Sequence, residues 1–185
     1  MVAAEAGVAK QRLDPAAAFG WQSRPMALSQ PAEAKAEALA TLKELVGDPD
    51  GSVVSRNRSA YEVTWLERDL AANPLLAGCL TVGDAVLLCL PGELFVEYQL
   101  AAQACRPDKF VATAAYSDNG LWYVPTAAEY PKGGYEVGVT FAADRGPDGV
   151  KEGCEQLEGE YVAAIADLLE VTAEQCVLPS WQPAL

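Results

Sequence analysis

AVLLCLPGELFVEYQLAAQACRPDKFVATAAY, residues 85–116, decides the fold of this chain. The stretch begins with an apolar run, turns at Pro91-Gly92 into a segment with helical spacing, and ends in a second apolar run. This order predicts strand, helix, strand, with parallel strands and a right-handed crossover. The first run is apolar almost throughout, which indicates a strand that is covered on both faces.

The segments on either side predict a hairpin and further helices. "AGCLTV" precedes "AVLLCL", and Gly83-Asp84 between them is typical of a two-residue hairpin turn. Four helices are predicted. The first opens at Pro31 and stops at Gly47, and the second starts at Ser59, with Glu62 completing a capping box, and ends at Asn73-Pro74. The third spans Glu93 to Cys105, and the last runs from about Glu155 to Glu170. The expected fold class is therefore α/β, with a mixed sheet that contains a hairpin and a βαβ unit, flanked by helices.

The 185 residues suffice for one domain with a proper core. Residues 1–30 show no clear period and are interpreted as a poorly defined N-terminal arm. Residues 31–171 form the α/β body, and residues 172–185 an irregular tail. "PKGGYEVGVTF", residues 131–141, predicts a glycine-rich turn followed by a short extended piece.

Composition excludes several classes of function. The net charge of −13 would repel phosphate backbones, which disfavours nucleic-acid binding. The chain has no histidine, so it cannot build a Ser-His or Cys-His couple by itself. The most apolar region, Leu75 to Leu90, is interrupted by Gly83-Asp84, which argues against a transmembrane segment. The first residues lack the continuous apolar stretch of a signal peptide.

The cysteines predict free thiols. No two of the five stand in a CxxC motif, and the odd count in apolar surroundings favours buried thiols over a disulfide framework. They are Cys79, Cys89, Cys105, Cys154 and Cys176.

Polar side chains follow both strands of the predicted βαβ unit. Glu93 comes just past the first strand, and Asn119 and Tyr123 come just past the second. In open α/β sheets, ligands bind outside the carboxyl ends of the strands, and neighbouring strands lie about 4.8 Å apart. These side chains can therefore converge on one pocket. The later turn at residues 133–135 could fold back over it.

Each of these residues also has a purely structural interpretation. A glutamate in the first turn of a helix complements the helix dipole by about 0.3–1 kcal/mol, so Glu93 could simply start a helix. Trp122 and Tyr123 could be ordinary aromatics at the edge of a core. Gly133-Gly134 could be only a turn. Spacing alone leaves these alternatives open.

Three motifs occur in an order that resembles a known family. "LPGELFVEY" (90–98), "NGLWYVPTAAEY" (119–130) and "GGYEV" (133–137) resemble the neutral/alkaline non-lysosomal ceramidase family, in its short bacterial branch. The likeness runs from about Leu80 to Val137 and more loosely includes the flanking helices. On this resemblance, residues 31–171 correspond to the C-terminal portion of a ceramidase-like catalytic domain. The resemblance therefore implies an incomplete domain, and the unpatterned residues 1–30 fit a domain that is cut in its middle.

The resemblance implies a zinc amidase that cleaves the N-acyl bond of ceramide. Glu93 and Tyr123 match the positions of zinc ligands in that family. Tyr135, twelve residues after Tyr123, matches an active-site tyrosine that assists the polarised amide carbonyl. Asn119 matches the asparagine that opens the second motif, whereas Leu121 stands where the family has a tyrosine.

Two zinc ligands of that family are histidines from its N-terminal half, and this chain has none. Because zinc needs three or four protein ligands, we expect zinc to be lost from this chain alone. The implied partners are the missing N-terminal half and a lipid-like N-acyl amide substrate. Relatives are mostly exported, yet no signal peptide is evident, so the compartment stays open.

Two other hypotheses remain at this point. The chain could be a non-catalytic remnant that acts as a binding or interaction module. It could also be an unrelated α/β domain in which the Pro-Gly-Glu turn is only the start of a helix. A surface that once belonged to a domain core would favour self-association.

Overall fold

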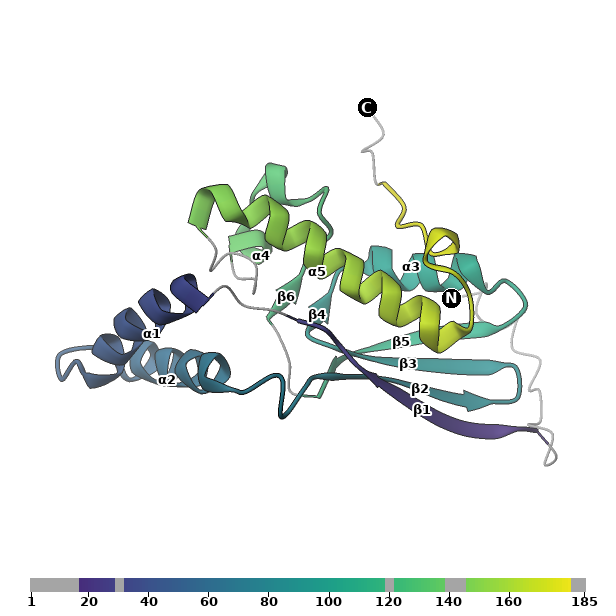
Figure 1. The fold of residues 1–185 in the computed structure, drawn as a ribbon, viewed down its shortest axis with the longest axis horizontal. Helices are drawn as coiled ribbons and strands as arrows, with labels where there is room; N and C mark the ends of the chain where they lie inside the picture. The colour runs from purple at the N-terminus through teal and green to yellow at the C-terminus, as the bar shows by residue number, and fades with distance from the viewer. Residues whose placement is uncertain (1–16, 29–31, 119–121, 139–145, 181–185) are drawn as a thin grey trace, which may run out of the picture.

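The computed structural model describes residues 17–28, 32–118, 122–138 and 146–180, which contain both strands and helices (Figure 1). The elements are β1 (Phe19–Pro25), α1 (Ala32–Gly47), α2 (Val53–Glu67), β2 (Leu76–Val82), β3 (Ala85–Pro91), β4 (Glu93–Leu94), α3 (Val96–Cys105), β5 (Phe110–Ser117), β6 (Tyr123–Val124), η1 (Tyr130–Lys132), α4 (Tyr135–Gly138), α5 (Gly146–Leu169) and η3 (Ala173–Gln175).

The main sheet has four strands in the order β1-β2-β3-β5, and β4 pairs with β6 in a separate two-stranded sheet. Strands β2 and β3 form the predicted antiparallel hairpin, and Gly83 in its turn has a positive φ of 59°. Strands β3 and β5 are parallel and joined by α3, which confirms the βαβ unit. The mixed sheet confirms the predicted α/β class.

Helices α3 and α5 cover one face of the main sheet, whereas α1 and α2 pack against each other away from it (Figure 1). Burial of the apolar stripe of α5 confirms the inward face predicted for the last helix. All four of its predicted residues are at most 5% exposed: Leu157, Tyr161, Ile165 and Leu168. The helix itself begins at Gly146, earlier than the predicted Glu155.

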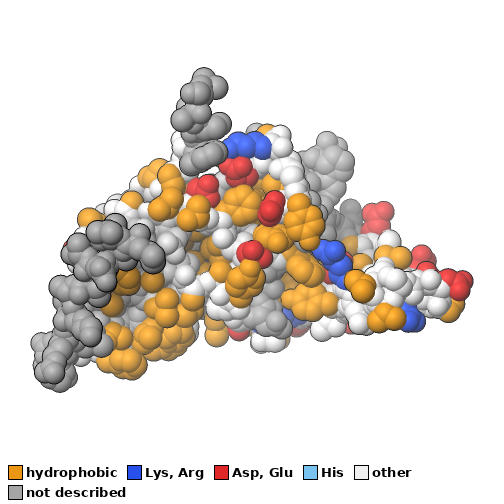
Figure 2. All heavy atoms as spheres, turned by 180° about the vertical axis from the view of Figure 1, so that it is seen from behind, with side chains coloured by type: hydrophobic (Ala, Val, Ile, Leu, Met, Phe, Trp, Pro, Cys, Tyr) orange, Lys and Arg blue, Asp and Glu red, His pale blue; other side chains and the backbone are white. Residues whose placement is uncertain are grey.

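Strand β3 is covered on one face only, so the prediction of burial on both faces is wrong. Val86, Leu88 and Leu90 are buried, but Leu87 between them is 36% exposed. The helices lie on one side, and the opposite face keeps large apolar side chains in solvent, including Trp21 and Phe110. Hydrophobic side chains gather over the sheet when the molecule is seen from behind (Figure 2). Apolar surface of this kind is typical of interaction sites.

Part of the expected N-terminal arm is the edge strand β1, which pairs antiparallel with β2. The sequence pattern did not predict this strand, because its side chains that face helix α5 are polar. The Gln22 amide donates to the Leu168 carbonyl at 2.7 Å, and Arg24 forms ion pairs with Glu160 and Asp167. Polar groups of helix α5 thus satisfy these side chains, so β1 packs on α5 without the alternating apolar residues that are typical of a strand.

Helix α2 begins six residues before the predicted Ser59. Its N-cap is Ser52, whose Oγ accepts a hydrogen bond from the Ser55 N–H at 3.1 Å. Ser59 lies buried inside the helix, so the predicted capping box with Glu62 is wrong. The helix ends at Glu67, before the predicted stop at Asn73-Pro74. Both serines are good caps by residue type, so residue type alone does not distinguish the two starts.

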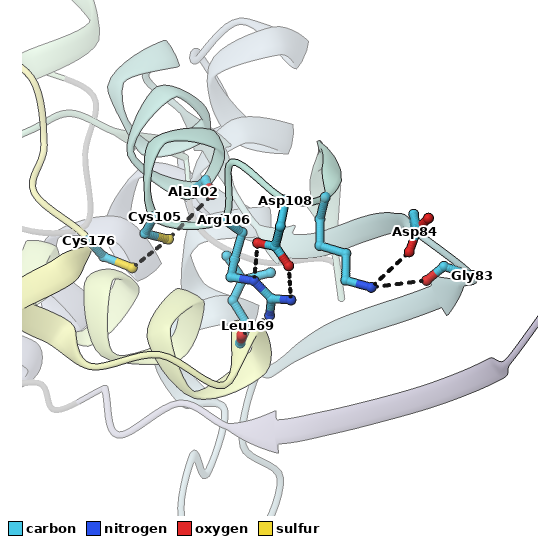
Figure 3. A network of polar contacts seen from close by, with 9 residues as sticks. Gly83, Asp84, Ala102, Cys105, Arg106, Asp108, Leu169 and Cys176 are labelled. Carbon is cyan, nitrogen blue, oxygen red and sulfur yellow. Dashed lines mark hydrogen bonds and ion pairs between the residues drawn. The ribbon is translucent and has the colours of Figure 1, made fainter.

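Four cysteines in the described part of the chain are free thiols, as predicted: Cys79, Cys89, Cys105 and Cys176. Three of them are buried, as predicted, whereas Cys89 is half-buried. The side chain of Cys154 lies outside the described residues. The expected irregular tail contains η3, and just after it Cys176 Sγ lies 3.0 Å from Cys105 Sγ in the core (Figure 3). Arg106 connects the end of α3 to the end of α5, because its guanidinium donates a hydrogen bond to the Leu169 carbonyl at 2.6 Å.

Arg106 also holds Asp108 through two hydrogen bonds of 2.9 Å, which lower the pKa of this carboxyl to about 2 (Figure 3).

None of the helices in the described part of the chain combines the length and apolar character that crossing a bilayer requires.

We expect Tyr161→Phe to destabilise the fold by about 1–3 kcal/mol, because the buried Pro91 carbonyl would lose its hydrogen-bond donor. The Tyr161 hydroxyl donates to that carbonyl at 2.7 Å, and burial raises the pKa of this phenol. Chemical denaturation measures the change. Tyr135→Phe, at a position 63% exposed, is the control and should stay within about 0.5 kcal/mol of the unchanged chain. Equal effects in both variants would contradict this assignment.

We also expect oxidised glutathione to link Cys105 to Cys176. Their thiols would become one disulfide while the reagent is reduced to two molecules of glutathione. Burial is the main cause that raises the pKa of Cys176, to about 12, so the reaction should be slow in the folded chain. Closing a loop across 71 residues should stabilise the fold by up to about 4 kcal/mol.

Peptide mapping identifies the linked cysteines, and thermal unfolding measures the gain. Cys176→Ser should abolish both, whereas Cys89→Ser should leave them intact. A disulfide that forms between other cysteines would show the expectation to be wrong.

Candidate functional site

After the Pro91-Gly92 turn, Glu93 lies in an extended segment rather than in a helix. Gly92 has a positive φ of 78°, and Glu93 belongs to β4, while α3 starts only at Val96. The Glu93 N–H donates to the Trp122 carbonyl at 3.0 Å. The predicted helix start at Glu93 is therefore wrong, because its backbone pairs with a neighbouring strand instead.

The pairing of β4 with β6 brings two of the predicted site residues side by side. The two strands are parallel, and Glu93 stands in register with Tyr123. Both side chains are half-buried. Residues in register on neighbouring strands project to the same face, so the carboxylate and the phenol face the same side. Burial, followed by the negative charge of Glu93, raises the pKa of Tyr123.

Tyr135 also lies against Tyr123. Their ring centroids are 5.9 Å apart in an edge-on arrangement, and Tyr135 is 63% exposed. The chain returns to β6 through Gly133 and Gly134, whose φ angles are 69° and 115°. The glycine-rich turn thus folds back over the site, as the sequence suggested. Tyr135 itself begins the short helix α4, so the extended piece predicted there is wrong over residues 135–138.

Tyr116 is a fourth member of the site that the sequence did not single out. It lies near the end of β5, is 66% exposed, and has a positive φ of 62°. Its backbone N–H donates to the Gly92 carbonyl at 2.7 Å. A side-chain hydrogen bond with Glu93 is the main cause that raises the pKa of the Tyr116 phenol. We call Glu93, Tyr116, Tyr123 and Tyr135 the carboxylate–tyrosine cluster.

A cavity of about 480 Å³ lies along helix α2. Trp122, the residue before Tyr123, contacts the ring of Tyr61 with centroids 5.2 Å apart. Tyr61 is part of the cavity wall, and the guanidinium of Arg58 lies 5.3 Å from the centre of the Trp122 ring. The lining residues are Ala60, Tyr61, Thr64, Trp65, Arg68 and Asn73.

The cluster offers zinc part of a ligand set. Glu93 and Tyr123 supply a carboxylate and a phenol oxygen, both of which are able to bind zinc, but zinc needs three or four protein ligands. Among the described residues, no group of three or more His, Cys, Asp or Glu is placed to hold a metal ion. Asn119 and Leu121, which belong to the same motif, lie outside the described residues.

Comparisons with known proteins give one partial likeness. No protein-family model and no curated protein matches the chain. A solved structure described as "Ceramidase complexed with C2" is similar over 57% of this chain and 17% of its own, with a TM-score of 0.37 and 21% identity. The chain thus spans about a sixth of that protein. At this TM-score and identity the likeness assigns neither a family nor a site to this chain.

We expect Gly92→Ala to destabilise the fold by about 1–2 kcal/mol, because a side chain at a positive φ is strained. Gly159→Ala is the matched control. A Cβ at this position in α5 meets nothing within 4 Å, so alanine should stabilise the helix by up to about 1 kcal/mol. Chemical denaturation of both variants checks the difference. A neutral Gly92→Ala would mean that the turn relaxes without strain.

Proposed function

We propose that this chain is the C-terminal part of a zinc-dependent amidohydrolase that resembles neutral ceramidase. Its substrate would be the N-acyl amide of a ceramide-like lipid. The observation that carries the proposal is the register pairing of Glu93 with Tyr123, with Tyr135 against the same phenol. These three residues come from the three separate motifs of the resemblance, and they lie close together in the fold.

The roles follow from the chemistry of the side chains. When bound, zinc would polarise an amide carbonyl and make a bound water acidic enough to attack near neutral pH. Glu93 and Tyr123 would hold the metal through their oxygens. Tyr135 would donate its phenol hydrogen bond to the carbonyl oxygen as negative charge develops there. Its exposure leaves that hydroxyl open to a substrate.

The chain by itself would be inactive. It supplies two of the ligands, and the histidines would come from the N-terminal half of the domain as a separate or missing segment. The cavity beside Trp122 supports a substrate with an apolar part, because the aromatic side chains of Tyr61 and Trp65 form part of its wall.

A second candidate function is a non-catalytic binding or interaction module. The uncovered face of the main sheet favours it, since Trp21 and Phe110 are 59% and 72% exposed there. This hypothesis needs no zinc and assigns Glu93 no chemistry, so a metal titration separates the two candidates.

We expect the metal-free chain to bind Zn²⁺ weakly in isothermal titration calorimetry. Glu93→Gln and Tyr123→Phe should each weaken this binding by roughly 100-fold or more, since losing a ligand costs at least as much as losing an outer partner of the metal. Glu97→Gln is the matched control, because Glu97 lies four residues further on, in the first turn of α3. It should bind Zn²⁺ like the unchanged chain.

Two results would count against the enzyme hypothesis. One is Zn²⁺ binding that neither Glu93→Gln nor Tyr123→Phe alters. The other is N-acyl amide hydrolysis, after a histidine-bearing N-terminal segment has been added, that proceeds equally well with Glu93→Ala.

A further inference from the structure

The face of the main sheet opposite helices α3 and α5 carries three rows of side chains. The strand register sets these rows, because residues paired across neighbouring strands project to the same side. We call the twelve residues of these rows the outer face. They are Phe19, Val82, Ala85 and Phe110 in the first row, Trp21, Leu80, Leu87 and Ala112 in the second, and Ser23, Gly78, Cys89 and Ala114 in the third.

The outer face lacks the polar character that a sheet face in solvent normally has. None of its twelve side chains is charged, and only Ser23 carries a hydroxyl. Phe19, Trp21 and Phe110 are 75%, 59% and 72% exposed. The opposite face is already apolar and covered by helices. An apolar sheet face is stable when a further layer packs on it, and the described residues supply such a layer on one side only (Figure 1).

The charged residues at the two ends of the outer face are paired within the chain. Beside the first row, Lys109 Nζ lies 3.2 Å from Asp84 Oδ1. At the other end, Arg68 Nη2 lies 3.8 Å from Asp118 Oδ2, which accepts a hydrogen bond from the Leu76 N–H. A chain with a net charge of −13 therefore presents a neutral surface here, on which a second copy meets little local repulsion.

The outer face is large enough to hold a dimer together. Its strands are seven or eight residues long, and about 3.3 Å per residue with about 4.8 Å between strands gives a footprint of about 440 Å². Two copies together would cover about 900 Å² before the relief of the side chains is counted, whereas crystal contacts mostly bury less than about 800 Å² and specific interfaces about 1,000 Å² or more. Homodimer interfaces are also the more apolar ones.

We propose that this chain forms a twofold dimer in which two outer faces pack against each other as a β-sandwich. Packed sheets lie about 10 Å apart, so the helices of both copies stay on the outside. Their charges lie further apart than the Debye length of about 8 Å in physiological salt and are screened. The inference does not rest on the proposed function, because none of the proposed metal ligands belongs to the outer face.

The sizes of the outer-face side chains fit this arrangement. Strands of packed sheets are nearly aligned, and a twofold axis along them lays β1 of one copy over β5 of the other. Trp21 spans the second and third rows, because a Cβ on Gly78 would lie 2.5 Å from Cη2 of its ring. The bulky ring thus meets the small Ala112 and Ala114 of the other copy. Because the axis also lays β2 over β3, the aliphatic side chains of the second row meet at the centre.

Sedimentation equilibrium of the full chain tests the dimer. We expect a Kd in the micromolar range at physiological salt, since interfaces near the standard size bind at least this tightly. Leu87→Lys should raise the Kd by roughly 30-fold or more, because an unpaired charge would be buried at the centre of the interface. Phe110→Lys on the edge strand is a second variant. Val54→Lys, at a position 78% exposed on α2, is the matched control and should dimerise like the unchanged chain.

The thiol of Cys89 reports on the outer face directly. It is half-buried, whereas the other thiols of the described residues, Cys79, Cys105 and Cys176, are buried. Its reaction with N-ethylmaleimide, mapped by mass spectrometry, should slow as the chain concentration rises through the Kd. Leu87→Lys should remove this dependence. At about 0.01 M salt, where the Debye length is about 30 Å, the Kd should rise because the outer charges repel.

Four outcomes would overturn the inference. A monomer throughout the micromolar range would mean that a different chain covers the outer face. A dimer that both Leu87→Lys and Phe110→Lys leave unchanged would be held by another surface. A dimer in which Cys89 reacts as fast as in the monomer would leave the outer face open. Association without a fixed stoichiometry would show a non-specific apolar surface.

Discussion

Two buried tyrosine hydroxyls hold the chain segments on either side of the β4–β6 pair. Tyr161 of α5 donates to the Pro91 carbonyl just before β4, and Tyr98 of α3 donates to the Pro125 carbonyl just after β6, at 3.1 Å. Their rings also contact each other, with centroids 5.6 Å apart. A buried carbonyl without a donor is costly, so these bonds fix the two turns that flank the β4–β6 pair. The register of Glu93 with Tyr123 depends on both.

The strained positions follow from this arrangement. The chain must leave the parallel sheet after β3 and pair at once with β6, and Gly92 makes the reversal with a positive φ. On the neighbouring strand, Tyr116 takes a positive φ where its N–H meets the Gly92 carbonyl. Glycine adopts this φ without strain, so the strain lies at Tyr116, and backbone strain that a packed core enforces is found preferentially at functional sites.

Much of the fold could be predicted from local patterns. The hairpin at Gly83-Asp84 and the parallel pair around α3 depend on turn residues and apolar runs, which act locally. Strand β1 could not be predicted, because its polar residues are satisfied by α5, more than 130 residues away in sequence. The start of α2 could not be predicted either, because Ser52 and Ser59 both suit a cap by residue type.

The sequence by itself determined the α/β class, the βαβ unit and the edge at which Glu93 and Tyr123 meet, because apolar runs and turn residues specify local structure. Only the tertiary structure decided that Glu93 lies in a strand, that Tyr135 lies against Tyr123, and that Tyr116 joins them. A tyrosine near the end of a strand carries no local signal of a bulge. Its hydrogen bond to the Gly92 carbonyl exists because β5 lies beside β3 and the turn that follows β3, and that packing is a property of the whole core.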